Sequence, residues 1–337
     1  MSRGICTEKG FKLNPTALAH MIISGRDVLT RTRVAAKVVE GVADNNSERS
    51  PTRIIILDGK NIGWLYPLRD LHRKIYCLSD EIIPINPWKV PLGINSVEWM
   101  KYITDAFCRA YGVSKEDQSI LFGAVRTVYE KAGIADGVSF KHIHECLNDD
   151  PIARERHMLM QTVAYYTDPT RIEGALYGDD KSEGVETVLS YSGITVFEPG
   201  CLSTSCRRFL YGVISSALFL MNRHISPNKW QETLLVLGDA EEIFYCYMYD
   251  YGDKKAIRPF NLYDKIYRIG SSTGLYVMAL CSELERIPED ALECSGVHIL
   301  LGESKDDDDM CECMTKSRRY ATPHSITYTK VKAITIG

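Results

Sequence analysis

The fold is decided by the stretch His20-Met21-Ile22-Ile23-Ser24-Gly25-Arg26-Asp27-Val28-Leu29-Thr30-Arg31-Thr32. Residues 21–24 have the apolar composition of a short buried strand, and from Arg33 onward apolar residues recur with helical spacing. The turn between the two patterns begins at Gly25. The stretch therefore predicts a strand–turn–helix unit, which is the building block of α/β folds.

The spacing within this turn is that of a phosphate-binding loop that lacks two of its parts. It reads G-x-x-x-x-T-R-T, whereas such a loop reads G-x-x-x-x-G-K-[ST]. Thr30 replaces the second glycine and resists the positive φ that turns N–H groups toward phosphate, at about 1–2 kcal/mol. Arg31 replaces a compact lysine with a larger planar group, and Asp27 adds a negative charge. A former phosphate loop and an ordinary strand–turn–helix are both open interpretations at this point.

A second acidic motif follows a later apolar run, at residues 233–237. A nucleotide hydrolase needs a carboxylate here to hold Mg²⁺ and a neighbouring carboxylate to polarise water. Gly238 stands where the magnesium carboxylate is expected, and Asp239 then takes the place of the base. A shifted register would use Asp239 for magnesium and Glu241 for water. Asp239 and Glu241 are thus the candidate catalytic residues, and a buried strand that ends in an acidic turn is the alternative.

Apolar runs and helical patterns alternate along most of the chain, which predicts a mainly parallel sheet covered on both faces. The predicted strands are residues 21–24, 53–58, 74–78, 193–197, 233–237, 275–280 and 297–301, with an edge strand or hairpin over 325–336. Helical periodicity dominates between residues 94 and 177, where Ser114 and Ser139 are candidate N-caps. We predict helices over 97–111, 114–131 and 151–166, and an exposed loop over 174–184.

Composition places the chain among globular proteins with an ample core. It has 337 residues, 45% of them hydrophobic and 25% charged, and a net charge of −4, so no global basic field favours nucleic acid. We find no apolar run long enough for a membrane span and no signal-peptide core. With 11 cysteines and no secretory signal, we expect reduced thiols and a cytoplasmic location.

No metal site is predicted. Cys311 and Cys313, with Cys294 and His298 upstream, do not have the spacing of a standard zinc set. A pair at His142 and His144 lies two residues apart on a helical pattern, so the two side chains would not share a face.

Taken together, these pieces resemble the motor domain of HerA–FtsK-type DNA-pumping ATPases, especially the HerA and conjugative type IV secretion branches. The resemblance covers residues 4–336 and is carried by the order of segments 13–24, 54–60, 83–88, 266–270 and 274–292. It implies a P-loop NTPase-like (RecA/FtsK-like) α/β core formed by residues 1–93 and 178–337. Residues 94–177 would form an α-helical insertion in that core.

The resemblance also implies a ligand and partners. ATP or ADP with Mg²⁺ would contact Gly25, Arg31 and Thr32, and Ser282 stands where the family carries its sensor glutamine. Subunits of the family pack head to tail, with an arginine of one reaching the nucleotide of the next. The candidates for that arginine are Arg268, Arg318 and Arg319.

Three hypotheses about function follow. The first is a pseudo-ATPase: the phosphate loop, the magnesium ligand and the sensor all depart from the family pattern, so hydrolysis is lost while the fold is kept. Such a chain would be a structural or regulatory subunit, in a homo- or hetero-oligomer or ring with an active ATPase or nuclease, in DNA transport, processing or defence. The second is a weak or partner-activated DNA translocase that uses Arg31. The third is a DNA- or protein-binding adaptor without nucleotide, with small basic patches at 154–157 and 206–208.

Overall fold

The computed structural model describes residues 5–6, 12–13, 18–44, 52–59, 68, 73–78, 85–132, 137–177, 183–224, 231–248, 262–301 and 327–331. Arg318, Arg319, Cys311 and Cys313 lie outside the described residues, as does most of the predicted C-terminal strand.

Eight of the described strands form one sheet in which every neighbouring pair is parallel. Across the sheet they are β12 (Thr327–Val331), β11 (Val297–Leu301), β3 (Met21–Ser24), β10 (Leu275–Cys281), β9 (Thr233–Leu237), β4 (Arg53–Leu57), β8 (Ile194–Glu198) and β5 (Arg73–Cys77). The predicted parallel α/β sheet is confirmed, and its strands begin and end within a residue or two of the apolar runs. A separate antiparallel pair joins β1 (Ile5–Cys6) to β2 (Lys12–Leu13).

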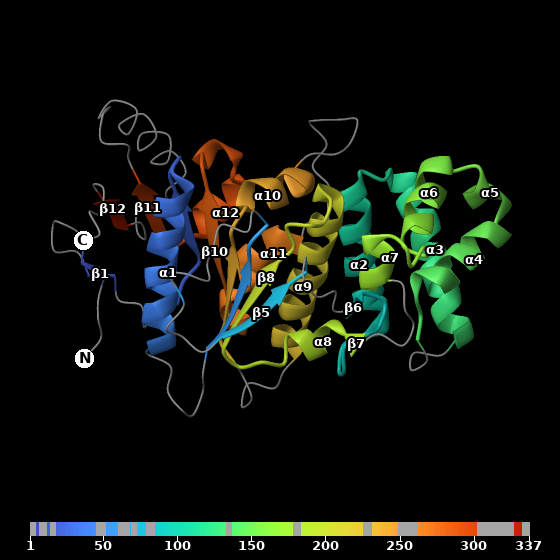
Figure 1. The fold of residues 1–337 in the computed structure, drawn as a ribbon, viewed down its shortest axis with the longest axis horizontal. Helices are drawn as coiled ribbons and strands as arrows, with labels where there is room; N and C mark the ends of the chain where they lie inside the picture. Colours follow the sequence, from blue (N-terminus) through green and yellow to red (C-terminus); the bar gives the residue numbers. More distant parts are fainter. Residues whose placement is uncertain are drawn as a thin grey trace.

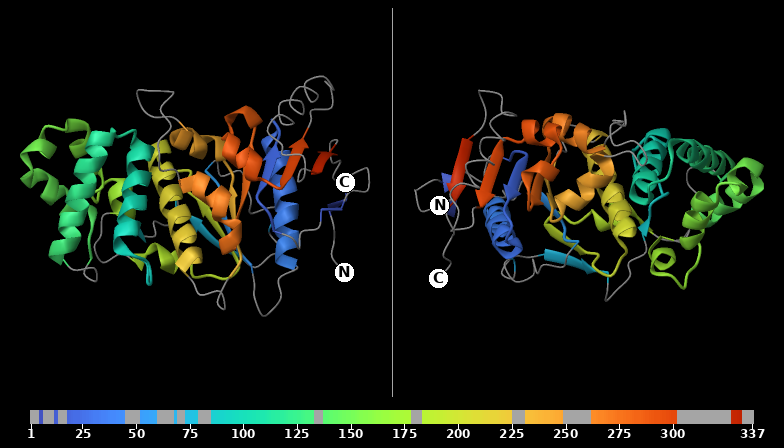
Figure 2. Two further views of the ribbon diagram at one scale, coloured as in Figure 1. Left: turned by 180° about the vertical axis from the view of Figure 1, so that it is seen from behind. Right: turned by 90° about the horizontal axis from the view of Figure 1, so that it is seen from above.

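Alternate strand residues build two cores, one on each face of the sheet. Ile54 and Ile56 pack with α1 (Val28–Asp44), whereas Ile55 and Leu57 belong to the larger core on the opposite face. That larger core includes α9 (Thr204–His224), α10 (Ala240–Met248), α11 (Leu262–Ile269) and α12 (Glu289–Cys294). Figure 2 shows α1 and the α10–α12 group on opposite sides of the strands. Burial on both faces explains why the central strands β4, β9 and β10 are mainly apolar, whereas β5 at the edge of the sheet begins with Arg73 and Lys74.

In the described part of the chain between β6 (Ile85–Asn86) and β7 (Glu183–Gly184), which pair in parallel, six helices follow one another. They are α2 (Ser96–Tyr111), α3 (Lys115–Ala132), α4 (Phe140–Asp149), α5 (Pro151–Arg154), α6 (His157–Tyr165) and α7 (Ile172–Tyr177). Figure 1 shows them extending away from the sheet, with α2 beside α9. The division into a core and an insertion at residues 94 and 177 stays a prediction.

The predicted caps are present in this helical part. The Oγ atom of Ser114 accepts from the Asp117 N–H at 3.1 Å, and Ser139 forms a capping box with His142. Two predictions were wrong. Residues 151–166 form two helices, and the stretch 174–184, predicted as an exposed loop, begins with the last residues of α7, where Tyr177 is fully buried.

An aromatic cluster joins the helical part to the sheet. Phe140 of α4 stacks on Tyr166 with ring centroids 4.3 Å apart, and Phe107 of α2 meets Phe209 of α9 edge to face at 5.3 Å. Tyr177 packs against Phe209 at 5.3 Å. The same helix α9 therefore covers the sheet and anchors the helical part. Among the described residues, every helix is too short or too polar to cross a bilayer.

Candidate functional site

The turn between β3 and α1 is only three residues long. Gly25, Arg26 and Asp27 separate the strand from a helix that begins at Val28. The expectation that helical structure starts at Arg33 was wrong, because the helix begins earlier and takes Thr30 into its first turn. In a phosphate loop of the predicted spacing, the residues before Arg31 would lie in a loop outside the helix. Here Val28, Leu29 and Thr30 are helical, so the turn does not have the backbone conformation of a phosphate loop.

Asp27 is the reason that the helix begins early. Its Oδ2 atom accepts from the Thr30 N–H at 2.9 Å and from the Thr30 hydroxyl, and its carbonyl accepts from the Arg31 N–H at 3.1 Å. This is the pattern of an aspartate N-cap. Hydrogen bonds from the Thr30 side chain and backbone lower the pKa of the Asp27 carboxyl. A carboxylate thus stands at the helix N-terminus, the place that a bound phosphate would take.

Gly25 is required by packing at this turn. Its N–H donates to the Cys281 carbonyl at 3.1 Å, which ties the turn to the end of β10. A Cβ atom on Gly25 would lie 2.7 Å from Cβ of Leu301 at the end of β11. The first glycine of the motif therefore has a structural role that needs no phosphate.

Arg31 turns its guanidinium back onto the same loop. The side chain is buried, and its Nη1 donates to the Gly25 carbonyl and, at 3.4 Å, to the Arg26 carbonyl. A phosphate cradle offers N–H groups to its ligand, whereas here an arginine of the chain itself is bound to the carbonyls of the loop. The Arg31 side chain therefore provides hydrogen-bond donors to the carbonyl groups of its own turn.

The end of β9 leaves no room for a carboxylate at Gly238. The Gly238 N–H donates to the Leu57 carbonyl at 2.9 Å, and a Cβ atom on Gly238 would approach that oxygen to 2.8 Å. Asp239, the next residue, is buried and immediately precedes α10, and its carbonyl accepts from the Glu242 N–H at 3.1 Å. Burial raises the pKa of Tyr211 well above its usual value, and the nearby charge of Asp239 adds to this effect.

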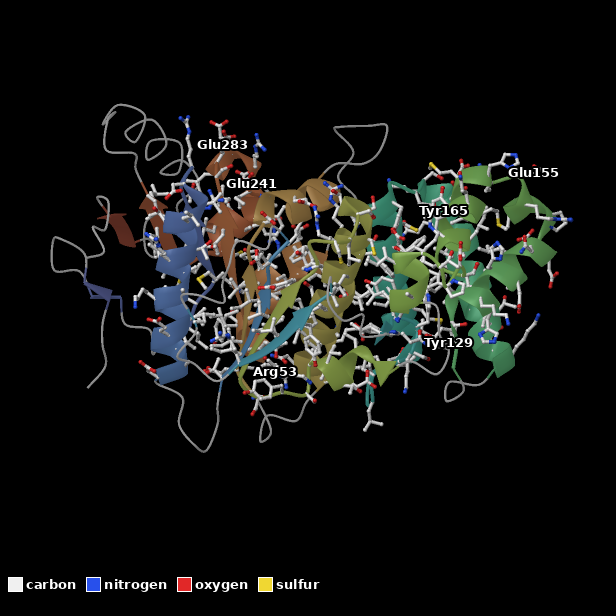
Figure 3. All side chains as sticks on the ribbon, viewed as in Figure 1. Arg53, Tyr129, Glu155, Tyr165, Glu241 and Glu283 are labelled. Atoms are coloured by element: carbon white, nitrogen blue, oxygen red, sulfur yellow. The ribbon has the colours of Figure 1, made fainter. Side chains whose placement is uncertain are left out.

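Glu241 is held by the residues that follow β10. Its Oε1 accepts from the N–H and, at 2.6 Å, the Oγ of Ser282, and from the Glu283 N–H at 3.1 Å. Its Oε2 lies 3.6 Å from Nη1 of Arg286. Burial alone would raise the pKa of Glu241, but these donors outweigh it and the pKa lies below its usual value. Figure 3 places Glu241 and Glu283 together at the carboxyl edge of the sheet.

These groups surround one cavity at that edge. It has a volume of about 370 Å³ and is lined by Arg31, Arg208, Asp239, Glu241, Glu242, Leu280 and Arg286. Part of its charge is paired internally, since Nη2 of Arg207 lies 3.0 Å from Oε1 of Glu242. With Asp27 at the helix N-terminus and no space for a carboxylate at Gly238, this arrangement does not fit a magnesium–polyphosphate bound as in a P-loop.

The structure brings some of the predicted site residues together and separates others. Arg31, Asp239 and Glu241 line the cavity, and Ser282 reaches it through Glu241. Thr32 is buried within α1. Arg268 lies on α11, where its guanidinium pairs with Asp290 of α12. Within the described parts of the chain, His, Cys, Asp and Glu side chains form no group of three or more that could hold a metal ion.

Three side chains at or beside the candidate site were not among the predicted site residues. Asp27 was noted only for its charge, although an Asp three residues before Thr30 is an N-cap signal. The sequence places Arg208 in a small basic patch, whereas in the structure it lines the cavity and its neighbour Arg207 pairs with Glu242. Arg286 follows β10 on η3 (Leu284–Arg286), and no spacing in the sequence links it to Glu241.

Solved structures with this fold include VirB4 and the plasmid coupling protein TrwB. VirB4 of Thermoanaerobacter pseudethanolicus superposes with a TM-score of 0.65 at 13% identity, over 93% of this chain and 86% of that one. The plasmid coupling protein TrwB in complex with ADP and Mg²⁺ gives a TM-score of 0.50 at 12% identity, over 83% of this chain and 66% of that one. TrwB in complex with the GTP analogue GDPNP gives 0.50 at 11% identity, with the same coverage.

These likenesses confirm the predicted P-loop NTPase-like α/β fold. No family model and no curated protein matches the sequence. At 11–13% identity the similarity concerns the course of the chain and leaves the chemistry to be argued from the site.

Proposed function

We propose that this chain is a catalytically degenerate HerA–FtsK-like ATPase domain that acts as a structural or regulatory subunit. The observation that carries the proposal is the closed turn at the start of α1. There Asp27 caps the helix and Arg31 is bound to the loop carbonyls. A nucleotide would have to displace both before its phosphates could reach the backbone N–H groups.

Two further features support loss of hydrolysis. The close approach of the Leu57 carbonyl to Gly238 leaves no place for a magnesium carboxylate at the end of β9. Glu241, the candidate for polarising water, has one carboxylate oxygen that already accepts hydrogen bonds from Ser282 and the Glu283 N–H. Because phosphoryl transfer depends on positioning and electrostatic stabilisation, these changes together remove most of the means of catalysis.

The assembly that we propose is an oligomer in DNA transport, processing or defence, in the cytoplasm. The partner would be a second copy of this chain or an active ATPase or nuclease, and a head-to-tail interface between such subunits closes only as a ring. Arg268, Arg318 and Arg319 remain the candidates for contact with a neighbouring subunit. Arg268 would have to exchange its pairing with Asp290 for that contact.

A second candidate function is a weak or partner-activated ATPase. The observation in its favour is the cavity itself, whose lining includes Arg31, Asp239 and Glu241. TrwB, one of the structural neighbours, has been solved with ADP and Mg²⁺. If a partner drew Arg31 away from the Gly25 carbonyl, its guanidinium could turn toward phosphates, with Asp239 near the reacting end. An adaptor that binds DNA or protein without nucleotide is the third candidate.

Calorimetry with Mg-ATP and Mg-ADP separates these candidates. We expect no binding heat up to millimolar nucleotide for the wild-type chain. Asp27→Asn, which keeps a capping oxygen and removes the charge, should bind more tightly than the wild type if Asp27 is what excludes phosphate. Arg31→Ala is the matched control: it should lose nucleotide binding only if Arg31 contacts the nucleotide.

Micromolar wild-type binding that is lost in Arg31→Ala would overturn the proposal in favour of the variant ATPase. If nucleotide does not bind, titration of labelled DNA at increasing salt tests the adaptor, because phosphate contacts release counterions and give a steep salt dependence. Circular dichroism of each variant establishes that it is folded.

A further inference from the structure

Leu92 has the highest exposed fraction of any large apolar side chain in the described part of the chain. It is 96% exposed and lies in the turn between β6 and α2. Val97, in the first turn of α2, is 45% exposed. Single exposed apolar residues are common on protein surfaces, but these two lie five residues apart on one short segment. That segment therefore presents a small apolar surface to solvent.

The turn holds Leu92 in a defined place. The Ile94 N–H donates to the Pro91 carbonyl at 3.1 Å, and Gly93 has a φ of +81°. This is a β-turn that needs glycine at its third position. The turn leads directly into α2, whose N-cap is Asn95. Leu92 is therefore displayed by a hydrogen-bonded turn that is joined to a helix.

Lysines flank the apolar pair. In the segment from Lys89 to Lys101 the charged side chains are these two lysines and Glu98, and both lysines are exposed. Lys101 follows Val97 by four residues, so the two side chains lie on the same face of α2. The exposed charges beside the apolar pair are thus mainly positive.

The one acidic side chain of the segment is already paired with α9. The Glu98 carboxylate lies 2.6 Å from Nη1 of Arg223 and 3.1 Å from Nε2 of His224. Burial, and then the nearby charge of Arg223, lower the pKa of Lys265 on α11, which places a further cation beside Arg223. Although the whole chain has a net charge of −4, this corner of the molecule carries an excess of positive charge.

We propose that this corner docks onto the surface of a lipid bilayer that is rich in anionic lipid. The docking surface consists of Lys89, Leu92, Val97, Lys101 and Arg223. Leu92 would enter the headgroup region, while the cations lie beside the negatively charged lipid headgroups. The contact is peripheral and reversible, because one or two apolar side chains with a few cations give only weak attachment.

Two observations favour a bilayer over other anionic partners. Leu92 is almost fully exposed on a turn, and a fluid interface accepts a protruding side chain without a preformed pocket. Nucleic acid is disfavoured, because leucine and valine offer it neither a hydrogen bond nor an aromatic ring for stacking. The surface is also separate from the cavity, since Figure 1 shows β6 on the lower side of the molecule and α10 on the upper side.

The test is co-sedimentation of the full chain with lipid vesicles. One set of vesicles is made of phosphatidylcholine alone, and the other of equal parts of phosphatidylcholine and phosphatidylserine. We expect binding to the mixed vesicles at low salt and none to the neutral ones. The bound fraction should fall as sodium chloride is added, because salt screens the attraction between exposed charges.

Two variants assign the binding to this surface, each with a matched control. Leu92→Ser should weaken the partition coefficient about tenfold, and Lys101→Gln about fivefold. Ile152→Ser changes an apolar residue that is 61% exposed on α5, and Lys37→Gln changes an exposed lysine on α1. Both controls should bind as the wild type does. All of these positions are exposed, and circular dichroism establishes that each variant is folded.

The proposal is overturned if the wild type does not bind the mixed vesicles at low salt, or binds both kinds of vesicle equally. It is also overturned if Leu92→Ser and Lys101→Gln bind no more weakly than their controls. Binding of labelled polyglutamate that depends on Leu92, without binding to vesicles, would overturn it in favour of an acidic protein partner. These outcomes are independent of nucleotide binding at the cavity.

Discussion

Glycines at the carboxyl edge of the sheet are fixed by close approach. Gly25 meets Leu301, and Gly238 meets the Leu57 carbonyl, in each case at less than 3 Å from the place of a Cβ atom. Neither needs a positive φ. Gly25, the first glycine of the predicted phosphate loop, and Gly238, which stands where a magnesium carboxylate is expected, thus have the same physical explanation. At each position two chain segments are too close together to admit a side chain.

Gly25→Ala should therefore destabilise the fold. The added methyl group has to push against Cβ and the carbonyl of Leu301, and overpacking of this kind costs about 1–3 kcal/mol. The control is Gly123→Ala in α3, where a Cβ atom would meet nothing within 4 Å. That substitution should be neutral or stabilise by up to about 1 kcal/mol. Urea unfolding of both variants measures the difference, and equal midpoints would refute the packing explanation.

His20 should make stability depend on pH. Burial lowers its pKa from 6.5 to about 4, and its Nδ1 accepts from the Val277 N–H at 3.1 Å. Between these two pH values the unfolded chain binds a proton that the folded chain does not. The free energy of unfolding therefore falls as the pH drops through this window, by on the order of 3 kcal/mol.

Urea titrations at pH 7 and pH 4.5 of the wild type and of His20→Phe measure this contribution. The phenylalanine preserves the ring packed against Tyr267 and cannot titrate, so its loss of stability between the two pH values should be smaller. An identical loss in both proteins would mean that His20 does not contribute.

At the scale of elements, α1 depends on its first turn. Asp27→Ala removes the oxygen that caps Thr30 and should cost about 1 kcal/mol of stability. Asp27→Asn keeps an acceptor and should lie within a few tenths of a kcal/mol of the wild type. Denaturant unfolding of both variants decides between a hydrogen-bonding and a purely electrostatic role. If Asn is as damaging as Ala, the charge at the helix terminus carries the effect.

The elements could be predicted from the sequence to different degrees for physical reasons. Strands buried on both faces leave continuous apolar runs, so β4, β9 and β10 were located closely. The start of α1 was missed because the spacing of a phosphate loop was given more weight than the cap signal at Asp27. The break between α5 and α6 has no Pro or Gly to mark it.

The candidate site was only partly predictable for a different reason. Arg31, Asp239 and Glu241 follow strands whose carboxyl ends meet at one edge, so their proximity follows from the parallel sheet. Which side chain each of them binds is a matter of tertiary packing. The pairing of Glu241 with Ser282 and Arg286 joins segments 41 and 45 residues apart, and no sequence pattern encodes it.

At the scale of the whole molecule, the aromatic cluster should make the sheet and the helical part unfold together. Phe140→Ala removes a fully buried ring that contacts Trp88, Phe107, Tyr166 and Phe209, and should cost about 3–5 kcal/mol. Met158→Ala, at a side chain that is 54% exposed, is the control and should change little.

Far-ultraviolet circular dichroism and tryptophan fluorescence, recorded on the same denaturant series, test this coupling. Coincident transitions are expected for the wild type. Separate transitions in the wild type would show that the helical part is an independent folding unit and would contradict the role that we assign to the cluster.

The pairing of β6 with β7 has a consequence for how such a chain can change over time. Ile85 and Glu183 are partners in register, so the helical segment leaves and rejoins the chain across a single strand spacing of about 4.8 Å. A segment whose ends meet can be gained in one genetic event without rerouting any strand. Loss of the segment would be harder, because the aromatic side chains that pack against Phe209 of α9 would be removed and Phe209 would be exposed to water. Such a segment is easy to acquire and difficult to discard.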